Sequence, residues 1–116
     1  MSNTQKFFIG PMSKQIVDCI LAKDANLFGL IPSRRQIDYK SGYVNNWNTK
    51  SFSNYVKSIN SNFIICRDHA GAMQGAFPDD GYDSLNSDCL HYNMVHIDPW
   101  KFAKNIEEKI QFTFLI

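Results

Sequence analysis

The sharpest pair of chemically active side chains in this sequence is Asp68 followed directly by His69. Histidine binds metals or transfers protons near neutral pH, and aspartate acts as a base or a ligand. Neighbours on a regular strand point to opposite faces, so both side chains reach one site only where the backbone turns, as at a strand end. The alternative is structural: a buried His69 hydrogen-bonded to backbone, with Asp68 capping a turn.

A second pair, His96 and Asp98, lies two residues apart, which places both side chains on the same face of a strand. They could therefore face one pocket together, with Asp98 as a substrate contact. Two structural alternatives stay open. His96 would be a satisfied core histidine, and Asp98, which precedes Pro99, would be the N-cap of a helix.

Two adjacent arginines, Arg34 and Arg35, follow an apolar run that ends at Pro32. A guanidinium group pairs with phosphate oxygens through two parallel hydrogen bonds, so we predict that one of these arginines binds a phosphate. The alternative is a solvated pair on a surface loop. Gln36, the next residue, is predicted as a further substrate contact.

The same polar loop continues to Asn45 and Asn46, between Tyr43 and Trp47. Aromatic rings together with side-chain amides commonly hold a polyol, so these four residues are predicted to line a sugar site. A later segment, 71–81, is rich in glycine and aspartate. It predicts a mobile or tightly turning lid, with an aspartate pair at 79 and 80 as a possible cation site.

Four short apolar runs, starting near residues 7, 27, 63 and 94, must position these side chains. Each run is followed by a helical pattern, and Ser13 and Thr49 are the predicted N-caps of the first two helices. In the third helix, Leu85 and Cys89 form the predicted apolar face. The helical stripes cover residues 16–21, 52–59, 83–92 and 102–110.

Continuous apolar runs are typical of strands buried on both faces, and their alternation with helices predicts parallel βα units. The expected fold is therefore α/β, with four βα units in a single domain over residues 1–116. Four such units are half of a (β/α)₈ barrel, and a small doubly wound sheet is the alternative. In both architectures ligands bind at the carboxyl ends of the strands, where the polar residues above lie.

Composition excludes several other classes of protein. The net charge of +1 and the absence of a basic run argue against a nucleic-acid surface. Apolar runs of about five residues are far shorter than the roughly twenty that a membrane span needs, and the polar start does not resemble a signal peptide. Cys19, Cys66 and Cys89 lack zinc-site spacing and are predicted as buried free thiols, which indicates a reducing, cytoplasmic environment.

Three segments resemble the class II aldolase group of (β/α)₈ barrels, and most closely the tagatose-bisphosphate aldolase subunits. The first, GLIPSRRQIDYKSGYVNNWNTKSF over residues 29–52, is similar to the strand-two segment of that family. The second, RDHAG over residues 67–71, is similar to its strand-three end. The third, MVHIDPWKFAKNIEEKI over residues 94–110, resembles its strand-four end and the helix that follows.

The resemblance implies residue roles that the spacing alone does not give. By the family motif, Asp68 is the acid–base residue and His69 is a ligand of a catalytic zinc ion, which would polarise a ketose carbonyl during aldol cleavage. The other zinc-ligand histidines of the family belong to the second half of the barrel. The group also includes companion subunits that support a catalytic partner without doing chemistry themselves, and the strand-two segment fits these well.

The function expected from the sequence is that of the N-terminal half of a class II sugar-phosphate aldolase. The alternatives are a non-catalytic assembly subunit of such an aldolase, or an inactive truncated product. A half-barrel leaves the inner face of its sheet exposed, so a second copy or a partner subunit is expected to complete it.

Overall fold

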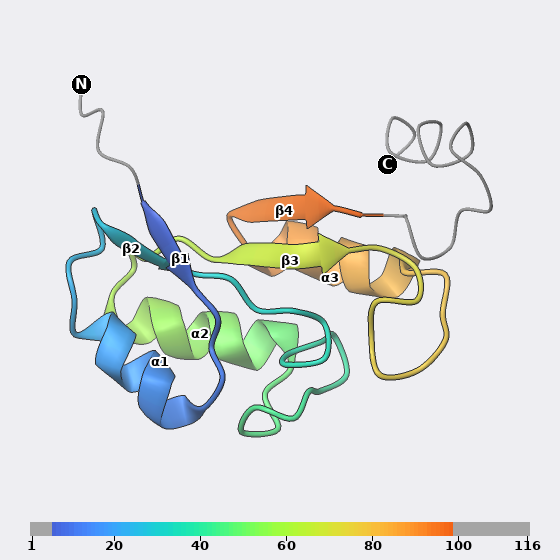
Figure 1. Cartoon of the computed structure of the whole chain (residues 1–116), viewed down its shortest axis with the longest axis horizontal. Helices are drawn as coiled ribbons and strands as arrows, with labels where there is room; N and C mark the ends of the chain where they lie inside the picture. Colours follow the sequence, from blue (N-terminus) through green and yellow to red (C-terminus); the bar gives the residue numbers. More distant parts are fainter. Residues whose placement is uncertain (1–5, 99–116) are drawn as a thin grey trace.

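The computed structural model describes residues 6–98, which form parallel strands and α-helices in alternation (Figure 1). No helix in this part of the chain has the length and apolar character needed to cross a membrane. The expected helix over residues 102–110 lies outside the described residues. In chain order the elements are β1 (Phe7–Ile9), α1 (Lys14–Leu21), β2 (Phe28–Leu30), α2 (Thr49–Ile59), β3 (Cys66–Ala70), α3 (Tyr82–His91) and β4 (Met94–Ile97).

The strands form two parallel pairs, β1 with β2 and β3 with β4. Two isolated parallel bridges, Leu30 to Ile65 and Ser33 to Asp68, connect the segment that contains β2 to the segment that contains β3. The backbone N–H of Leu30 also donates to the carbonyl of Ile64 at 3.0 Å. The expected α/β class with parallel strands is thus confirmed for the described residues.

The first two helices begin close to the predicted residues, but one cap differs. Ser13 caps α1, since its Oγ accepts a hydrogen bond from the N–H of Ile16 at 3.2 Å. The cap of α2 is Asn48 and not Thr49, because Asn48 and Ser51 exchange side-chain-to-backbone hydrogen bonds of 2.7 and 2.9 Å. Thr49 is fully buried instead.

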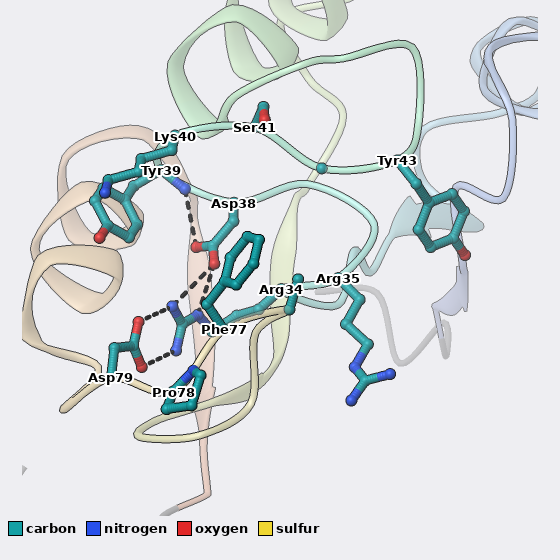
Figure 2. A pocket seen from close by; sticks show the side chains of 12 residues that line it. Arg34, Arg35, Asp38, Tyr39, Lys40, Ser41, Tyr43, Phe77, Pro78 and Asp79 are labelled. Atoms are coloured by element: carbon teal, nitrogen blue, oxygen red, sulfur yellow. Dashed lines mark hydrogen bonds and ion pairs between the residues drawn. The ribbon is translucent and has the colours of Figure 1, made fainter.

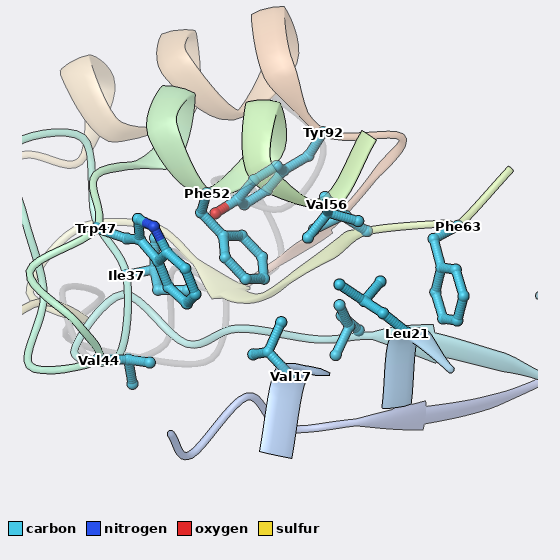
Figure 3. Close-up of a cluster of buried hydrophobic side chains, with 11 residues drawn as sticks. Val17, Leu21, Ile37, Val44, Trp47, Phe52, Val56, Phe63 and Tyr92 are labelled. Atoms are coloured by element: carbon cyan, nitrogen blue, oxygen red, sulfur yellow. The ribbon is translucent and has the colours of Figure 1, made fainter. Parts of the chain in front are cut away.

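The main core forms between α1, α2 and the long segment that joins β2 to α2 (Figure 3). Val17 and Leu21 of α1 face Phe52 and Val56 of α2 across this core. The joining segment is polar in sequence, yet it contributes three of the buried side chains, which are Ile37, Val44 and Trp47.

Trp47 is a core residue, so the prediction that it lines a sugar site is wrong. Its ring centroid lies 5.3 Å from that of Phe52 and 5.0 Å from that of Tyr55. Buried aromatic pairs at these separations stabilise a fold by more than the burial of their surface area alone. Trp47 therefore anchors the long loop on α2 and keeps the preceding residues in place.

A buried ion pair between Arg67 of β3 and Asp88 of α3 organises the other end of the molecule. Nε and Nη2 of Arg67 each donate to one carboxylate oxygen of Asp88 at 2.9 Å, and both side chains are fully buried. The guanidinium also donates to the carbonyl of Ile37 at 2.6 Å and to Thr49 Oγ1 at 3.3 Å. One arginine thus connects β3, α3, α2 and the long loop.

This ion pair also explains why α3 buries a different face from the predicted one. Ser84 and Asp88 are the buried residues of α3, whereas Cys89 is exposed and Leu85 is only half-buried. A buried guanidinium requires a carboxylate partner, and that requirement outweighs the weak apolar stripe of the helix.

All three cysteines are free, as predicted, but only Cys66 is buried. Burial raises the pKa of the Cys66 thiol, which keeps it protonated near neutral pH. The prediction that Cys19 and Cys89 are buried is wrong, since both lie on exposed helical positions.

Candidate metal centre

A β-bulge in β3 brings Asp68 and His69 to the same edge of the sheet. Arg67 is opposite Val95, but the next paired residue is Ala70, opposite Ile97, so β3 carries one extra residue between these positions. Within the bulge His69 has a φ of 48°, in the left-handed region that few non-glycine residues occupy. The bulge therefore overcomes the alternation that would otherwise send the two side chains to opposite faces.

Three side chains converge at this edge, Asp68 and His69 from β3 and His96 from β4. His69 Nε2 lies 3.5 Å from Asp68 Oδ1, and His96 Nδ1 lies 3.8 Å from the same oxygen. The two imidazole centroids are 5.0 Å apart. One ligand atom from each of the three residues lies within 4.8 Å of the others, so the group has the composition and spacing of a metal site.

Asp98, just beyond β4, orients one of these histidines. Its Oδ2 lies 2.6 Å from Nδ1 of His69, and its backbone N–H donates to the carbonyl of Ala70 at 2.6 Å. Metal-binding histidines usually donate their second ring N–H to a carboxylate in this way, which fixes the tautomer and the ring orientation. With Nδ1 engaged by Asp98, Nε2 is the His69 atom that faces Asp68 and His96. Asp68, His69, His96 and Asp98 are referred to below as the carboxylate–imidazole cluster.

The cluster is open to solvent on one side. The His69 side chain is 52% exposed and that of His96 is 55% exposed. Both structural alternatives for the histidines are therefore wrong, since neither is buried in a core. Asp68 and Asp98 are more covered than the two imidazoles. The cluster thus combines accessible imidazole nitrogens with carboxylates that are less exposed to solvent.

The geometry suits a small divalent transition metal such as zinc. In a tetrahedral zinc site with ligands at about 2.0–2.1 Å, neighbouring ligand atoms are about 3.4 Å apart. The separations of 3.5 and 3.8 Å around Asp68 Oδ1 are close to this value. The ligand atoms of all three residues lie within 4.8 Å of one another. Three protein ligands leave a fourth position for water or substrate, as in catalytic sites.

The Arg34 side chain is buried and forms ion pairs inside the protein. Its side chain is 1% exposed and forms ion pairs with Asp38 and Asp79, while Nη1 also donates to the carbonyl of Gly71 at 2.8 Å. Burial opposes the charge, but the hydrogen bonds to the two carboxylates raise the pKa of Arg34 above its ordinary value. The alternative of a solvated pair is thus wrong for Arg34, whereas Arg35 is exposed.

The two aspartates of the 71–81 segment have separate structural roles. The hydrogen bond from Arg34 lowers the pKa of Asp79, so this carboxylate is ionised at neutral pH and paired. Asp80 Oδ1 accepts from the N–H of Tyr82 at 3.0 Å, at the start of α3. Asp79 therefore ties the segment to the long loop, and Asp80 ties it to α3.

The remaining predicted substrate contacts lie on the long loop. Gln36 Oε1 accepts from the N–H of Ser33 at 2.9 Å, and a Cβ added to Gly10 would lie 3.6 Å from Gln36 Nε2, which places this amide beside the end of β1. Asn45 and Asn46 are exposed, with φ values of 52° and 53°. Asparagine tolerates this conformation, so the pair forms the turn between Val44 and Trp47. The sugar-binding role of these residues stays a prediction.

Comparisons of the chain with protein-family models, with curated proteins and with solved structures find no match.

Proposed function

We propose that this chain forms the metal-binding edge of a class II aldolase-like (β/α)₈ barrel that cleaves a sugar phosphate with the help of a divalent metal such as zinc. The observation that carries the proposal is the bulge in β3, which directs Asp68 and His69 to one edge beside His96. The bulge places at one edge the two residues to which the family resemblance assigns chemistry.

The roles of the cluster follow from its hydrogen bonds. His69 and His96 would hold the metal through nitrogen and Asp68 would hold it through Oδ1, with Asp98 orienting His69 from behind. A metal bound there would polarise the substrate carbonyl. Both short separations between Asp68 and the imidazoles involve Oδ1, so Oδ2 is the atom that would take or return the proton of the substrate hydroxyl.

The strand arrangement supports the barrel part of the proposal. The pairs β1–β2 and β3–β4, with the parallel bridges between the β2 and β3 segments, follow the chain order that a barrel requires. In Figure 1, α1 and α2 lie on the same side of the strands. A second copy of this chain or a partner subunit would supply the remaining strands and cover the other face.

A second function is favoured by the state of Arg34. Because two carboxylates and a carbonyl already occupy its guanidinium, Arg34 stabilises the loops and is not available for phosphate without breaking those contacts. This structural role of Arg34 fits a non-catalytic assembly subunit, which would support a catalytic partner through its surface.

One assay separates the two functions. The chain is incubated with fructose 1,6-bisphosphate, with and without zinc, and triose phosphate release is measured for the wild type and for Asp68→Asn and His69→Ala. Zinc-dependent cleavage that both variants lack supports the catalytic function. Cleavage that appears only after a partner is added, and that survives both substitutions, supports the assembly subunit and contradicts catalysis here. Light scattering with and without zinc gives the oligomeric state in parallel, and a monomer in both conditions contradicts self-assembly into a barrel.

A further inference from the structure

A pocket of about 670 Å³ lies between the long loop and the segment that precedes α3 (Figure 2). Its walls are formed by residues 34–35 and 38–43 on one side and residues 76–79 on the other. Its volume is in the range of small-molecule sites. No residue of the carboxylate–imidazole cluster lines it, so it is a separate feature of the surface.

The charges around this pocket favour an anion. The two carboxylates in its lining, Asp38 and Asp79, are paired with Arg34. Two other cations line the pocket, Arg35 and Lys40, and within residues 6–98 neither forms an ion pair. No carboxylate in the described part of the chain neutralises either charge there, although Lys40 Nζ lies 5.7 Å from the centroid of the Tyr39 ring. Arg35 presents the planar fork that matches a phosphate.

Exposed aromatic side chains accompany these cations. Phe77 is 81% exposed and Tyr43 is 65% exposed, although both line the pocket. In Figure 2, Phe77 lies between Arg35 and Tyr43 on one flank and Tyr39 and Lys40 on the other. A ligand with a ring would cover the apolar face of Phe77 while its charged group reached Arg35.

The walls of the pocket are fixed by close backbone approaches. A Cβ at Gly42 would lie 2.0 Å from the carbonyl oxygen of Gln36, so only glycine allows the loop to cross itself there. A Cβ at Gly75 would lie 3.0 Å from Asp38 Oδ2 and 3.1 Å from Arg34 Nη2. The ion pair of Arg34 with Asp79 and the close approach at Gly75 join the two sides of the pocket, and the approach at Gly42 fixes the path of the long loop itself.

We propose that this pocket binds a phosphorylated sugar, with the phosphate on Arg35, the ring on Phe77 and Lys40 adding positive charge. The geometry above supports the pocket and its preference for a ligand in which a ring carries a phosphate. Only the choice of a sugar as the ring rests on the proposed function. The pocket is thus a binding site for phosphorylated sugars that no residue of the carboxylate–imidazole cluster lines.

Calorimetric titration of the metal-free chain tests this proposal, with fructose 1,6-bisphosphate, AMP and inorganic phosphate as separate ligands. We expect fructose 1,6-bisphosphate to bind more tightly than inorganic phosphate, and Arg35→Gln and Phe77→Ala each to weaken binding by about tenfold. Lys50→Gln removes a charge from the exposed face of α2 and serves as the matched control, with no change expected.

Each of the following outcomes would overturn one part of the proposal. Failure of the wild type to bind, or equal binding by Arg35→Gln, overturns the pocket as a phosphate site. Tighter binding of AMP than of the sugar overturns the sugar assignment, and equal binding of inorganic phosphate overturns the role of the ring. The proposed function fails separately: if His69→Ala leaves zinc affinity unchanged while the metal-free chain still binds the sugar phosphate, the metal centre is wrong and the pocket stands.

Discussion

Nδ1 of His69 and Oδ2 of Asp98 lie 2.6 Å apart, although 29 positions separate the two residues in the chain. The contact joins the bulge of β3 to the end of β4 and leaves Nε2 of His69 directed at Asp68. A carboxylate behind an imidazole increases the basicity of the opposite nitrogen and fixes its direction. This pair is therefore the part of the cluster that prepares His69 to bind a metal.

Replacing Asp98 with asparagine tests that preparation. Asp98→Asn keeps the size of the side chain but removes the charge behind the ring, so zinc affinity should fall by about 10- to 100-fold. Competition with a chromophoric chelator measures the change. Asp83→Asn, on the exposed first turn of α3, is the control and should leave zinc affinity as it is. Equal affinities for Asp98→Asn and the wild type would show that Asp98 does not support a metal ligand.

The Arg67–Asp88 pair should make a large contribution to the stability of the fold over residues 6–98. Asp88→Ala leaves a buried guanidinium without its carboxylate, which should lower the free energy of unfolding by about 3–5 kcal/mol. Replacing both residues, in Arg67→Met with Asp88→Leu, should cost less than the sum of the two single changes because no charge is left unpaired. Urea unfolding of the wild type, Arg67→Met, Asp88→Leu and the double variant gives the four values of this cycle. Additive costs would contradict a direct interaction.

Substitution by alanine should destabilise the fold at Gly42 but not at Gly10. An alanine at position 42 would put its Cβ 2.0 Å from a backbone oxygen, so Gly42→Ala should lower the free energy of unfolding by about 1–3 kcal/mol. Gly10→Ala meets a side-chain amide at 3.6 Å, an ordinary contact, and is the matched control. Thermal unfolding of both variants compares them. Equal midpoints would mean that the loop does not cross itself as described.

Stability should fall in acid partly through Asp79. Its hydrogen bond with Arg34 lowers the pKa of Asp79 in the folded chain, so the unfolded chain binds the proton more tightly. The stabilisation is therefore fully present above the unfolded value and is lost as the pH falls below about 4. Asp79→Asn should be less stable at pH 7 and should lose less stability between pH 5 and pH 3. The free energy of unfolding is measured in urea at each pH. If it falls as steeply between pH 5 and pH 3 for Asp79→Asn as for the wild type, this role of Asp79 is contradicted.

The parallel α/β class and most elements could be predicted from the sequence because hydropathy marks them directly. The stripe of α1 and the run of β4 are examples, and both occur within a residue or two of the expected positions. The third apolar run starts near residue 63, whereas β3 extends from Cys66 to Ala70. Its polar residues pair with β4 or line the bulge, so hydropathy alone places its end too early.

The site could be predicted in composition but not in arrangement. Asp68 and His69 stood out by type, and the spacing of His96 and Asp98 indicated a shared face. A bulge has no signature in the sequence, so the convergence of all four required the structure. The burial of Arg34 and Arg67 is not evident from the sequence for a similar reason, since Asp79, one of the two carboxylate partners of Arg34, lies 45 residues away and Asp88, the partner of Arg67, lies 21 residues away.

The most direct test of the metal centre is zinc binding by the purified full chain, measured by calorimetry. The wild type should bind one zinc ion, His69→Gln and His96→Gln should each weaken binding by at least about tenfold, and the double variant should not bind. His91→Gln, which changes the remaining histidine of the sequence, at the end of α3, should bind zinc as the wild type does. Absence of zinc binding by the wild type, or equal binding by the double variant, would contradict the account.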